Sequence, residues 1–243
     1  MAHSTVKRIL ITNDDGIDSE GIIRLAEAAK DFGEVWVVAP DSQCSAASHC
    51  ITLRHSVEVH PHVFPVSGIK AFSCSGTPGD CIRVGSLNIM PEKPDVVFSG
   101  INYGYNVASD IQYSATAGAA FEAEFQGYSA IAFSEEGCLR HEVTDRYLKE
   151  IMAELIEEEY IPGQILNVNF PGCALSECKG ILWDRKVSRA AYFTDHYKEV
   201  RKLPDGGVEL MVEGIHIPVS DDGTDYGAVL DKYVSVGRVS NIG

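Results

Sequence analysis

Short apolar runs flank a helical pattern at the start of the chain. Residues 8–12 (RILIT) and 35–39 (VWVVA) are almost continuously apolar and β-branched, as is typical of strands covered on both faces. Between them, apolar side chains recur every three or four residues from Ile22 to Phe32, which predicts a helix that ends with Gly33 as its cap. A strand, a helix and a strand in this order predict a parallel sheet with a right-handed crossover.

The same patterns continue as far as residue 170. Three more buried strands and two more helices are predicted, the strands at residues 95–99, 130–134 and 164–170, and the helices at 116–126 and 140–159. A more polar, alternating stretch at residues 51–63 predicts an exposed or edge strand. The fold class is therefore α/β, with helices packed on a mostly parallel sheet.

The pattern changes after Pro171. Residues 191–213 are polar and alternating around the turn sequence PDGG at 204–207, which predicts a long β-hairpin. Residues 225–239 predict a helical segment followed by a strand at 233–239. A long hairpin without a core of its own needs a surface to pack on. A second copy of the chain is the simplest such surface, so we expect a homo-oligomer.

Composition narrows the class of protein. With 243 residues, 45% of them hydrophobic and 23% charged, the chain is typical of a globular protein with one large domain, or one core with an appendage. The formal net charge of -15 argues against a nucleic-acid duplex as partner, because duplex binders need a basic stripe. No apolar run approaches the roughly 20 residues of a membrane span, and the polar residues 1–7 show no signal peptide. We therefore expect a cytoplasmic protein with no membrane partner.

Polar side chains gather where three of the predicted strands end. They follow the first, second and third strands in turn, as Asn13, Asp14 and Asp15, then Ser42, Ser45 and Ser48, then Ser99, Asn102 and Asn106. Ligands of open parallel sheets bind beyond the carboxyl ends of the strands. We therefore expect carboxylates, hydroxyls and carboxamides to meet at one edge of the sheet.

The adjacent pair Asp14 and Asp15 is the sharpest chemical signal. Two neighbouring carboxylates repel each other and lose hydration, and a bound divalent cation relieves both effects. Mg²⁺ takes few carboxylates together with neutral oxygens, so this pair with a serine hydroxyl and an asparagine carbonyl is a suitable ligand set. No His or Cys accompanies the pair, which disfavours zinc. The alternative is that the pair caps the helix that begins near Ile17 or Ser19.

Two other segments could contact a phosphate group. Residues 114–118 (SATAG) open a predicted helix with small side chains and hydroxyls, which suits a phosphate cradle and equally suits an ordinary cap. Residues 75–80 (SGTPGD) either line the ligand site or only turn the chain into a helix near Cys81. The first strand–helix loop lacks GxGxxG, and the chain has neither a P-loop nor a GxSxG nucleophile motif.

Taken together, the motifs resemble those of the SurE family of 5′/3′-nucleotidases. The resemblance extends from residue 8 to residue 239. Its motifs occur in the order ILITNDDGI at 9–17, VVAPD at 37–41, SAxSHxITL at 45–53, SGTPGDC at 75–81, SGINYGYN at 99–106, DIQYSATAGAA at 110–120 and YVSV at 233–236. Any one of these could arise by chance, but their ordered succession is specific.

The resemblance implies a fold, a cofactor and an assembly. It implies a Rossmann-like three-layer core over residues 1–180, and a hairpin and tail over residues 181–243 that subunits exchange in a dimer or tetramer. It also implies one Mg²⁺ or Mn²⁺ ion per subunit, with four ligands that this chain retains: Asp14, Asp15, Ser45 and Asn102. The implied activity is that of a phosphoric monoester hydrolase acting on nucleoside 5′- and 3′-monophosphates.

The residues suggest a division of roles at such a site. Asp14 and Asp15 hold the metal ion, and one of them accepts a proton from the attacking water. The candidate substrate contacts are Asn13, Gly16, Asn106, Ser114 and Thr116.

Several positions depart from the family pattern, but none of them is one of the four implied metal ligands. They are Cys44, Ser48, Cys50, Tyr103, Tyr105 and Ala115. Because they lie beside the implied ligands, they bear on substrate preference and rate. They also leave open a non-catalytic, nucleotide-binding regulatory protein on the same fold. A receiver-like module is a weaker rival, because the strand over residues 96–98 ends in Ser99 where a phosphate-accepting Asp is needed.

Overall fold

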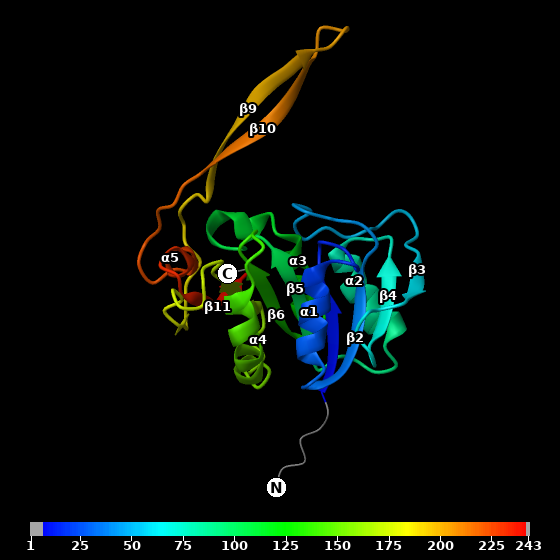
Figure 1. Cartoon of the computed structure of the whole chain (residues 1–243). Helices are drawn as coiled ribbons and strands as arrows, with labels where there is room; N and C mark the ends of the chain where they lie inside the picture. Colours follow the sequence, from blue (N-terminus) through cyan, green and yellow to red (C-terminus); the bar gives the residue numbers. More distant parts are fainter. Residues whose placement is uncertain (1–6, 242–243) are drawn as a thin grey trace.

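A nine-stranded sheet forms the body of the protein, in the order β3-β4-β2-β1-β5-β6-β7-β11-β8. The computed structural model describes residues 7–241 (Figure 1). Residues 1–7, in which the sequence predicts no signal peptide, lie outside the described residues except for Lys7. None of the helices within the described range is long and apolar enough to cross a membrane.

Six neighbouring strands of the sheet are parallel. They are β4 (Lys70–Cys74), β2 (Gly33–Pro40), β1 (Lys7–Thr12), β5 (Val96–Tyr103), β6 (Ser129–Glu135) and β7 (Gln164–Phe170). At one edge β3 (Val59–His62) runs antiparallel to β4, and at the other β11 (Val234–Ser240) runs antiparallel to β7 and carries the short β8 (Ile181–Leu182). The carboxyl ends of the parallel strands therefore meet at one edge, which is uppermost in Figure 1.

Helices cover both faces of the sheet and make three layers. One face carries α1 (Glu20–Ala29) and α4 (Glu142–Leu155), and the other carries α2 (Pro78–Val84) and α3 (Ala115–Phe125). Alternation within β1 shows how the sequence produces this, because Ile9 and Ile11 pack in the first core and Leu10 packs in the second. The α/β class predicted from the apolar runs is confirmed.

Shorter elements complete the chain. They are a π-helical turn η1 (Gly85–Ile89), a 3₁₀ turn η2 (Ala108–Gln112) and the helix α5 (Asp225–Leu230). The helical segment and strand expected over residues 225–239 are thus confirmed as α5 and β11. An edge strand was predicted over residues 51–63. Only Val59–His62 form a strand, β3, so this prediction is mostly wrong.

Two further expectations are corrected at element ends. Gly33 does not cap α1 but opens β2, where a side-chain Cβ would lie 2.0 Å from the Lys7 carbonyl oxygen. Close approach to β1 is therefore the reason for this glycine. The helix predicted over residues 140–159 is shorter, Glu142–Leu155, and β5 continues past Ser99 to Tyr103. That extension carries Asn102 on the strand itself.

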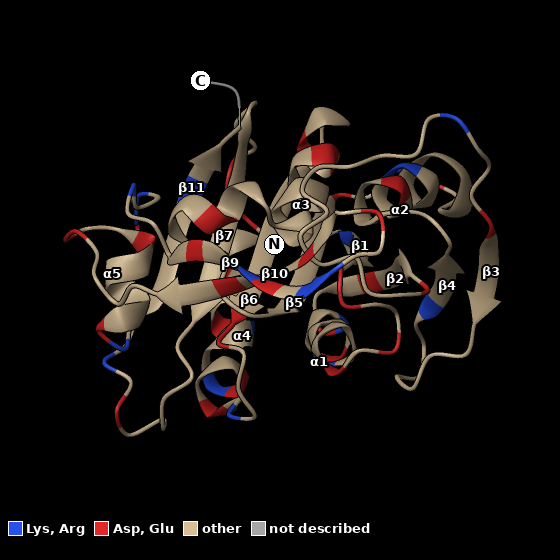
Figure 2. Ribbon diagram, turned by 90° about the horizontal axis from the view of Figure 1, so that it is seen from above, with Lys and Arg blue, Asp and Glu red and all other residues tan. Residues whose placement is uncertain are grey.

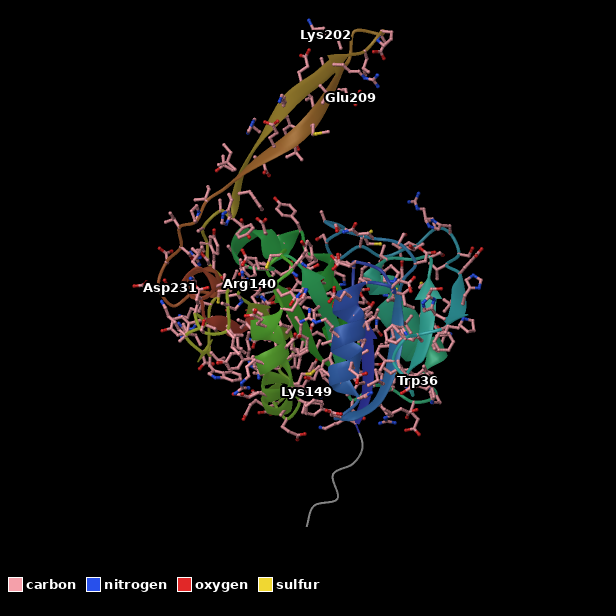
Figure 3. All side chains as sticks on the ribbon, viewed as in Figure 1. Trp36, Arg140, Lys149, Lys202, Glu209 and Asp231 are labelled. Carbon is pink, nitrogen blue, oxygen red and sulfur yellow. The ribbon has the colours of Figure 1, made fainter. Side chains whose placement is uncertain are left out.

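The predicted hairpin is present as a long ribbon of β9 (Phe193–Lys202) and β10 (Val208–His216). It projects beyond the body of the protein, with Lys202 and Glu209 toward its far end (Figure 3). Tyr197, Met211 and Ile215 are more than 60% exposed along it. Exposed apolar side chains on a ribbon without a core are suited to contact with a partner. The homo-oligomer stays a prediction, and so does the division of the chain into a core over residues 1–180 and a hairpin and tail over residues 181–243.

Candidate metal and phosphate site

Asp14 lies at the centre of the site and is only 4% exposed. Its Oδ1 accepts a hydrogen bond of 2.7 Å from Thr116 Oγ1, and its backbone oxygen accepts one of 2.7 Å from the Cys44 amide. Burial raises the pKa of Asp14 to about 6; the Thr116 hydrogen bond opposes this rise, and the charge of Asp15 adds to it. An ionised Asp14 is therefore held at a free-energy cost that a cation would offset.

Asp15 links the first strand end to its two neighbours. Its Oδ2 accepts a hydrogen bond of 3.0 Å from the Tyr103 amide at the end of β5, and its Oδ1 accepts one of 3.4 Å from Gln43 Nε2. The same Gln43 Nε2 donates to Ser45 Oγ at 2.9 Å. Burial also raises the pKa of Asp15. The loops after β1 and β2 and the end of β5 thus meet at Asp15, as the strand-end rule predicts.

Asn102 and Asn13 present oxygens at the same edge. The Asn102 Nδ2 donates to the Gly104 carbonyl at 2.8 Å, which fixes the carboxamide and leaves its oxygen for another partner. Asn13 Nδ2 donates to the Gly16 carbonyl at 2.9 Å and to Ser19 Oγ at 2.8 Å. Its Oδ1 is buried with no hydrogen-bond partner in the described part of the chain. The turn itself depends on Gly16, whose φ of +98° favours glycine.

The donor set fits a hard divalent cation. No ion pair found among residues 7–241 involves Asp14 or Asp15, so two carboxylates meet without a positive side chain. The described residues contain no cluster of three or more His, Cys, Asp and Glu side chains suited to a metal. Asp14, Asp15, Ser45 and Asn102 combine two carboxylates with neutral oxygens, and this set resembles what Mg²⁺ and Mn²⁺ take.

The alternative role of the acid pair, as a helix cap, is wrong. The helix α1 begins at Glu20 with Ser19 at its N-cap, and no side chain caps its first turn. The two carboxylates instead accept from Thr116, Gln43 and Tyr103. Figure 2 looks onto this end of the molecule and shows acidic residues in the loops that follow β1 and β2.

The candidate phosphate contacts are placed unequally. Ser114 is the N-cap of α3, and its Oγ accepts from the Ala117 amide at 2.9 Å, so the ordinary cap is present. Thr116 is fully buried and donates to Asp14. Asn106 Nδ2 donates to Ser134 Oγ at 2.8 Å. In this structure Thr116 and Asn106 therefore support other polar side chains of the site, and their role toward phosphate stays a prediction.

The loop that carries Ser45 is held against α3 by close backbone contact. A Cβ on Gly118 would lie 2.6 Å from the Ser48 carbonyl oxygen, so only glycine allows this approach. Ser48 itself adopts a left-handed φ of +54°, and its Oγ donates to the Gln112 carbonyl at 2.7 Å. Ser48, one of the positions that depart from the family pattern, therefore adopts a left-handed backbone conformation.

The segment SGTPGD turns the chain into α2, and the structure gives its side chains no place in the acid-pair network. Thr77 is the N-cap, and Thr77 and Asp80 form a reciprocal capping box. The Asp80 carboxylate also accepts from the Thr52 amide at 2.9 and 3.1 Å. Burial raises the pKa of Asp80, but the hydrogen bonds from Thr52 and Thr77 outweigh this and hold the pKa below its ordinary value.

Asp80→Ala is expected to lower the free energy of unfolding by about 2 kcal/mol at neutral pH, because the cap and a loop anchor are lost together. Since the folded pKa of Asp80 is depressed, its stabilisation is present above the ordinary carboxyl pKa and is lost as the pH falls through the folded value. Urea denaturation near neutral pH and at about pH 3 measures this. The gap from wild type should narrow in acid, whereas Asp222→Ala at an exposed position should show no gap; an equal gap at both pH values would contradict the assignment.

Two contacts of the candidate site were not predicted from the sequence. Gln43 bridges Asp15 and Ser45, and the Tyr103 backbone amide bonds Asp15. Gln43 does lie between two strand-end polar residues, so proximity to Ser45 is a signal that could have found it. The Tyr103 contact comes from a backbone group and has no residue-type signal.

Comparison with known proteins gives one consistent result. Residues 9–192 match the family described as survival protein SurE. The chain is 36% identical over 232 residues to the 5′-nucleotidase SurE of Clostridium botulinum (strain 657 / Type Ba4), covering 94% of this chain and 90% of that protein. It is 35% identical over 234 residues to the 5′-nucleotidase SurE of Alkaliphilus metalliredigens (strain QYMF), covering 94% and 91%. The crystal structure of the SurE protein from Aquifex aeolicus matches with a TM-score of 0.80 and 33% identity, over 96% of this chain and 93% of that one.

Proposed function

We propose a function from one premise: the chain belongs to the survival protein SurE family. It is a nucleotidase that hydrolyses nucleoside 5′-monophosphates, and also 3′-monophosphates, to nucleoside and phosphate with the help of a divalent metal ion. The observation that supports this most strongly is the pair Asp14 and Asp15. One of these carboxylates is deeply buried, neither forms an ion pair in the described structure, and neutral oxygens lie beside them at the carboxyl edge of the sheet.

Asp14, Asp15, Ser45 and Asn102 would hold one Mg²⁺ or Mn²⁺ ion per subunit. When bound, such an ion supplies positive charge for phosphate oxygens and lowers the pKa of a water molecule. The surrounding residues fix the ligands. Thr116 orients Asp14, the Tyr103 amide orients Asp15, and Gln43 keeps Ser45 beside Asp15.

Other groups of the chain handle the substrate. The first turn of α3, with Ser114 at its N-cap, presents backbone N–H groups toward a phosphate, and Asn106 lies at the neighbouring strand end. Either Asp14 or Asp15 accepts a proton from the attacking water, and Gly16 lets the backbone approach closely. The product is released as nucleoside and inorganic phosphate.

A metal-dependent substrate panel tests the function directly. We expect phosphate release from nucleoside 5′- and 3′-monophosphates with Mg²⁺ or Mn²⁺, and a loss of at least about 100-fold after chelation that added metal restores. Activity that survives complete chelation would contradict the metal role. Tight nucleotide binding without any turnover would instead favour the alternative, a non-catalytic regulatory protein. The positions at which the chain departs from the family pattern are the reason to consider this alternative.

The assembly and the cellular place belong to the same proposal. The exposed apolar side chains of β9 and β10 suit a dimer or tetramer, as expected from the sequence. A cytoplasmic location fits a nucleotide substrate.

A further inference from the structure

A cavity of about 220 Å³ lies directly beside the acid pair. Asp15 forms part of its wall, so it opens next to the proposed metal ion. The rest of the wall comes from the start of α1, the end of β5 and the loop after β6, with Gly21, Ile101, Tyr103, Leu139 and His141 among the lining residues.

Two large side chains on this wall are exposed to solvent. Tyr103 is 56% exposed and Leu139 is 91% exposed, although both lie against a polar site. The Tyr103 ring rests on the backbone at Gly137, where an added Cβ would lie 3.4 Å from the ring atom Cε1. One part of the ring is thus supported and the rest is open to solvent, so a ring face beside Asp15 is free to contact a ligand.

The position of Tyr103 is set independently of its ring. Its backbone amide donates to Asp15 Oδ2 at 3.0 Å, and the preceding residue is the proposed ligand Asn102. His141, on the same wall, lies with Nδ1 2.9 Å from Glu135 Oε1, so the buried Glu135 fixes it. The Tyr103 backbone and the His141 ring, both on the wall, are therefore each held by a polar contact.

Charge and size decide what the cavity can hold. The acidic side chains on its wall are Asp15, Glu20 and Glu135, of which Glu135 pairs with Arg24 at 2.6 Å, and the described lining residues contain no Lys or Arg. A second phosphate group would be repelled there. The volume is below the roughly 300–1,000 Å³ of pockets that enclose a whole drug-sized ligand. A single uncharged ring system fits both limits.

We propose that this cavity receives the nucleobase of the substrate, stacked on the ring of Tyr103 and packed against Leu139. This inference rests on the proposed function, and it assigns substrate recognition to a position where the chain departs from its family. Every nucleobase has a π-face, so stacking on Tyr103 favours aromatic phosphomonoesters over those without a base and tolerates different bases.

Tyr103→Ala separates base recognition from phosphate chemistry. We expect kcat/KM for adenosine 5′-monophosphate to fall about 10-fold, mainly through KM, while kcat/KM for ribose 5-phosphate stays within about twofold. Tyr103→Phe keeps the ring and should stay within about twofold on both substrates. The backbone bond to Asp15 survives both substitutions. Leu139→Ala, at a 91% exposed position that cannot disturb the core, should raise KM for the nucleotide about threefold.

The outcomes distinguish this inference from the proposed function. An equal loss on both esters, or no loss on the nucleotide, would overturn the base-binding role while leaving the phosphatase intact. If the wild type hydrolyses no phosphomonoester at all, the proposed function fails. In that case, calorimetric titration with adenosine tests the base-binding cavity alone. Binding to Tyr103→Ala that is about 10-fold weaker than to the wild type would support the cavity. Equal binding, or no detectable binding, by both proteins would overturn it.

Discussion

Asp14→Asn is expected to lower kcat/KM for nucleoside monophosphates by about 1,000-fold or more, because it removes the charge at the centre of the proposed metal site. The substitution keeps the shape of the side chain, and the Thr116 hydroxyl can still donate to the remaining carbonyl oxygen. Metal affinity should fall together with activity. Steady-state kinetics over a range of Mn²⁺ concentrations measures both effects, since weakened binding is partly overcome by excess metal.

Thermal unfolding of this variant reports on metal binding independently of activity. In the metal-free protein, Asp14→Asn removes a buried carboxylate that lies beside Asp15, so its Tm should equal or exceed that of the wild type. Added Mn²⁺ should raise the wild-type Tm and leave that of the variant nearly unchanged. Asp31→Asn, at an exposed position just beyond α1 where the carboxylate pairs with Lys149, is the control and should keep the wild-type response to Mn²⁺. A variant that keeps both activity and the metal-induced rise would contradict the site.

Gly21→Ala is expected to destabilise the protein by about 2–3 kcal/mol and to lower its Tm by roughly 5–10 °C. Gly21 lies in the first turn of α1, and an added Cβ would fall 2.0 Å from the Ile101 carbonyl oxygen. That neighbour is backbone and cannot rotate away. The helix must move off β5 at the residue before Asn102, so metal affinity should weaken as well.

The control for Gly21→Ala lies on the same helix. Glu27→Ala changes an exposed side chain and should alter the stability by no more than about 0.5 kcal/mol. Thermal melts and metal titrations of both variants test the prediction. An unchanged Tm in Gly21→Ala would show that the helix and strand can separate freely. A lower Tm with unchanged metal affinity would show that the shift stops short of Asn102.

The parts of this protein that sequence predicts well are those governed by local pattern. The run RILIT, the helix after it and the run VWVVA give the first strand–helix–strand unit, because apolar periodicity reflects which faces are buried. The position of the acid pair at the carboxyl edge of the sheet is predictable for a related reason, because it directly follows a parallel strand. Neither inference needed contacts between distant residues.

The parts that sequence missed depend on such distant contacts. β4 has the polar and short sequence KAFSC, and it becomes a strand because β2 and β3 pair with it on either side. Thr116 was expected to face a phosphate, but its hydroxyl meets Asp14, which is 102 residues away. The cavity beside Asp15 forms only where α1, β5 and the loop after β6 come together. The spacing of residues along the chain does not predict these contacts.

The place of β11 in the sheet has a consequence for how the chain is made. β11 lies between β7 and β8, so β8 has no strand to pair with until residues 234–240 have been synthesised. During translation, β7 therefore presents an open edge with unpaired backbone groups while about sixty further residues emerge. In that interval the nascent chain is most prone to associate with other chains through the open edge of β7. Pairing of β11 with β7 ends this exposure.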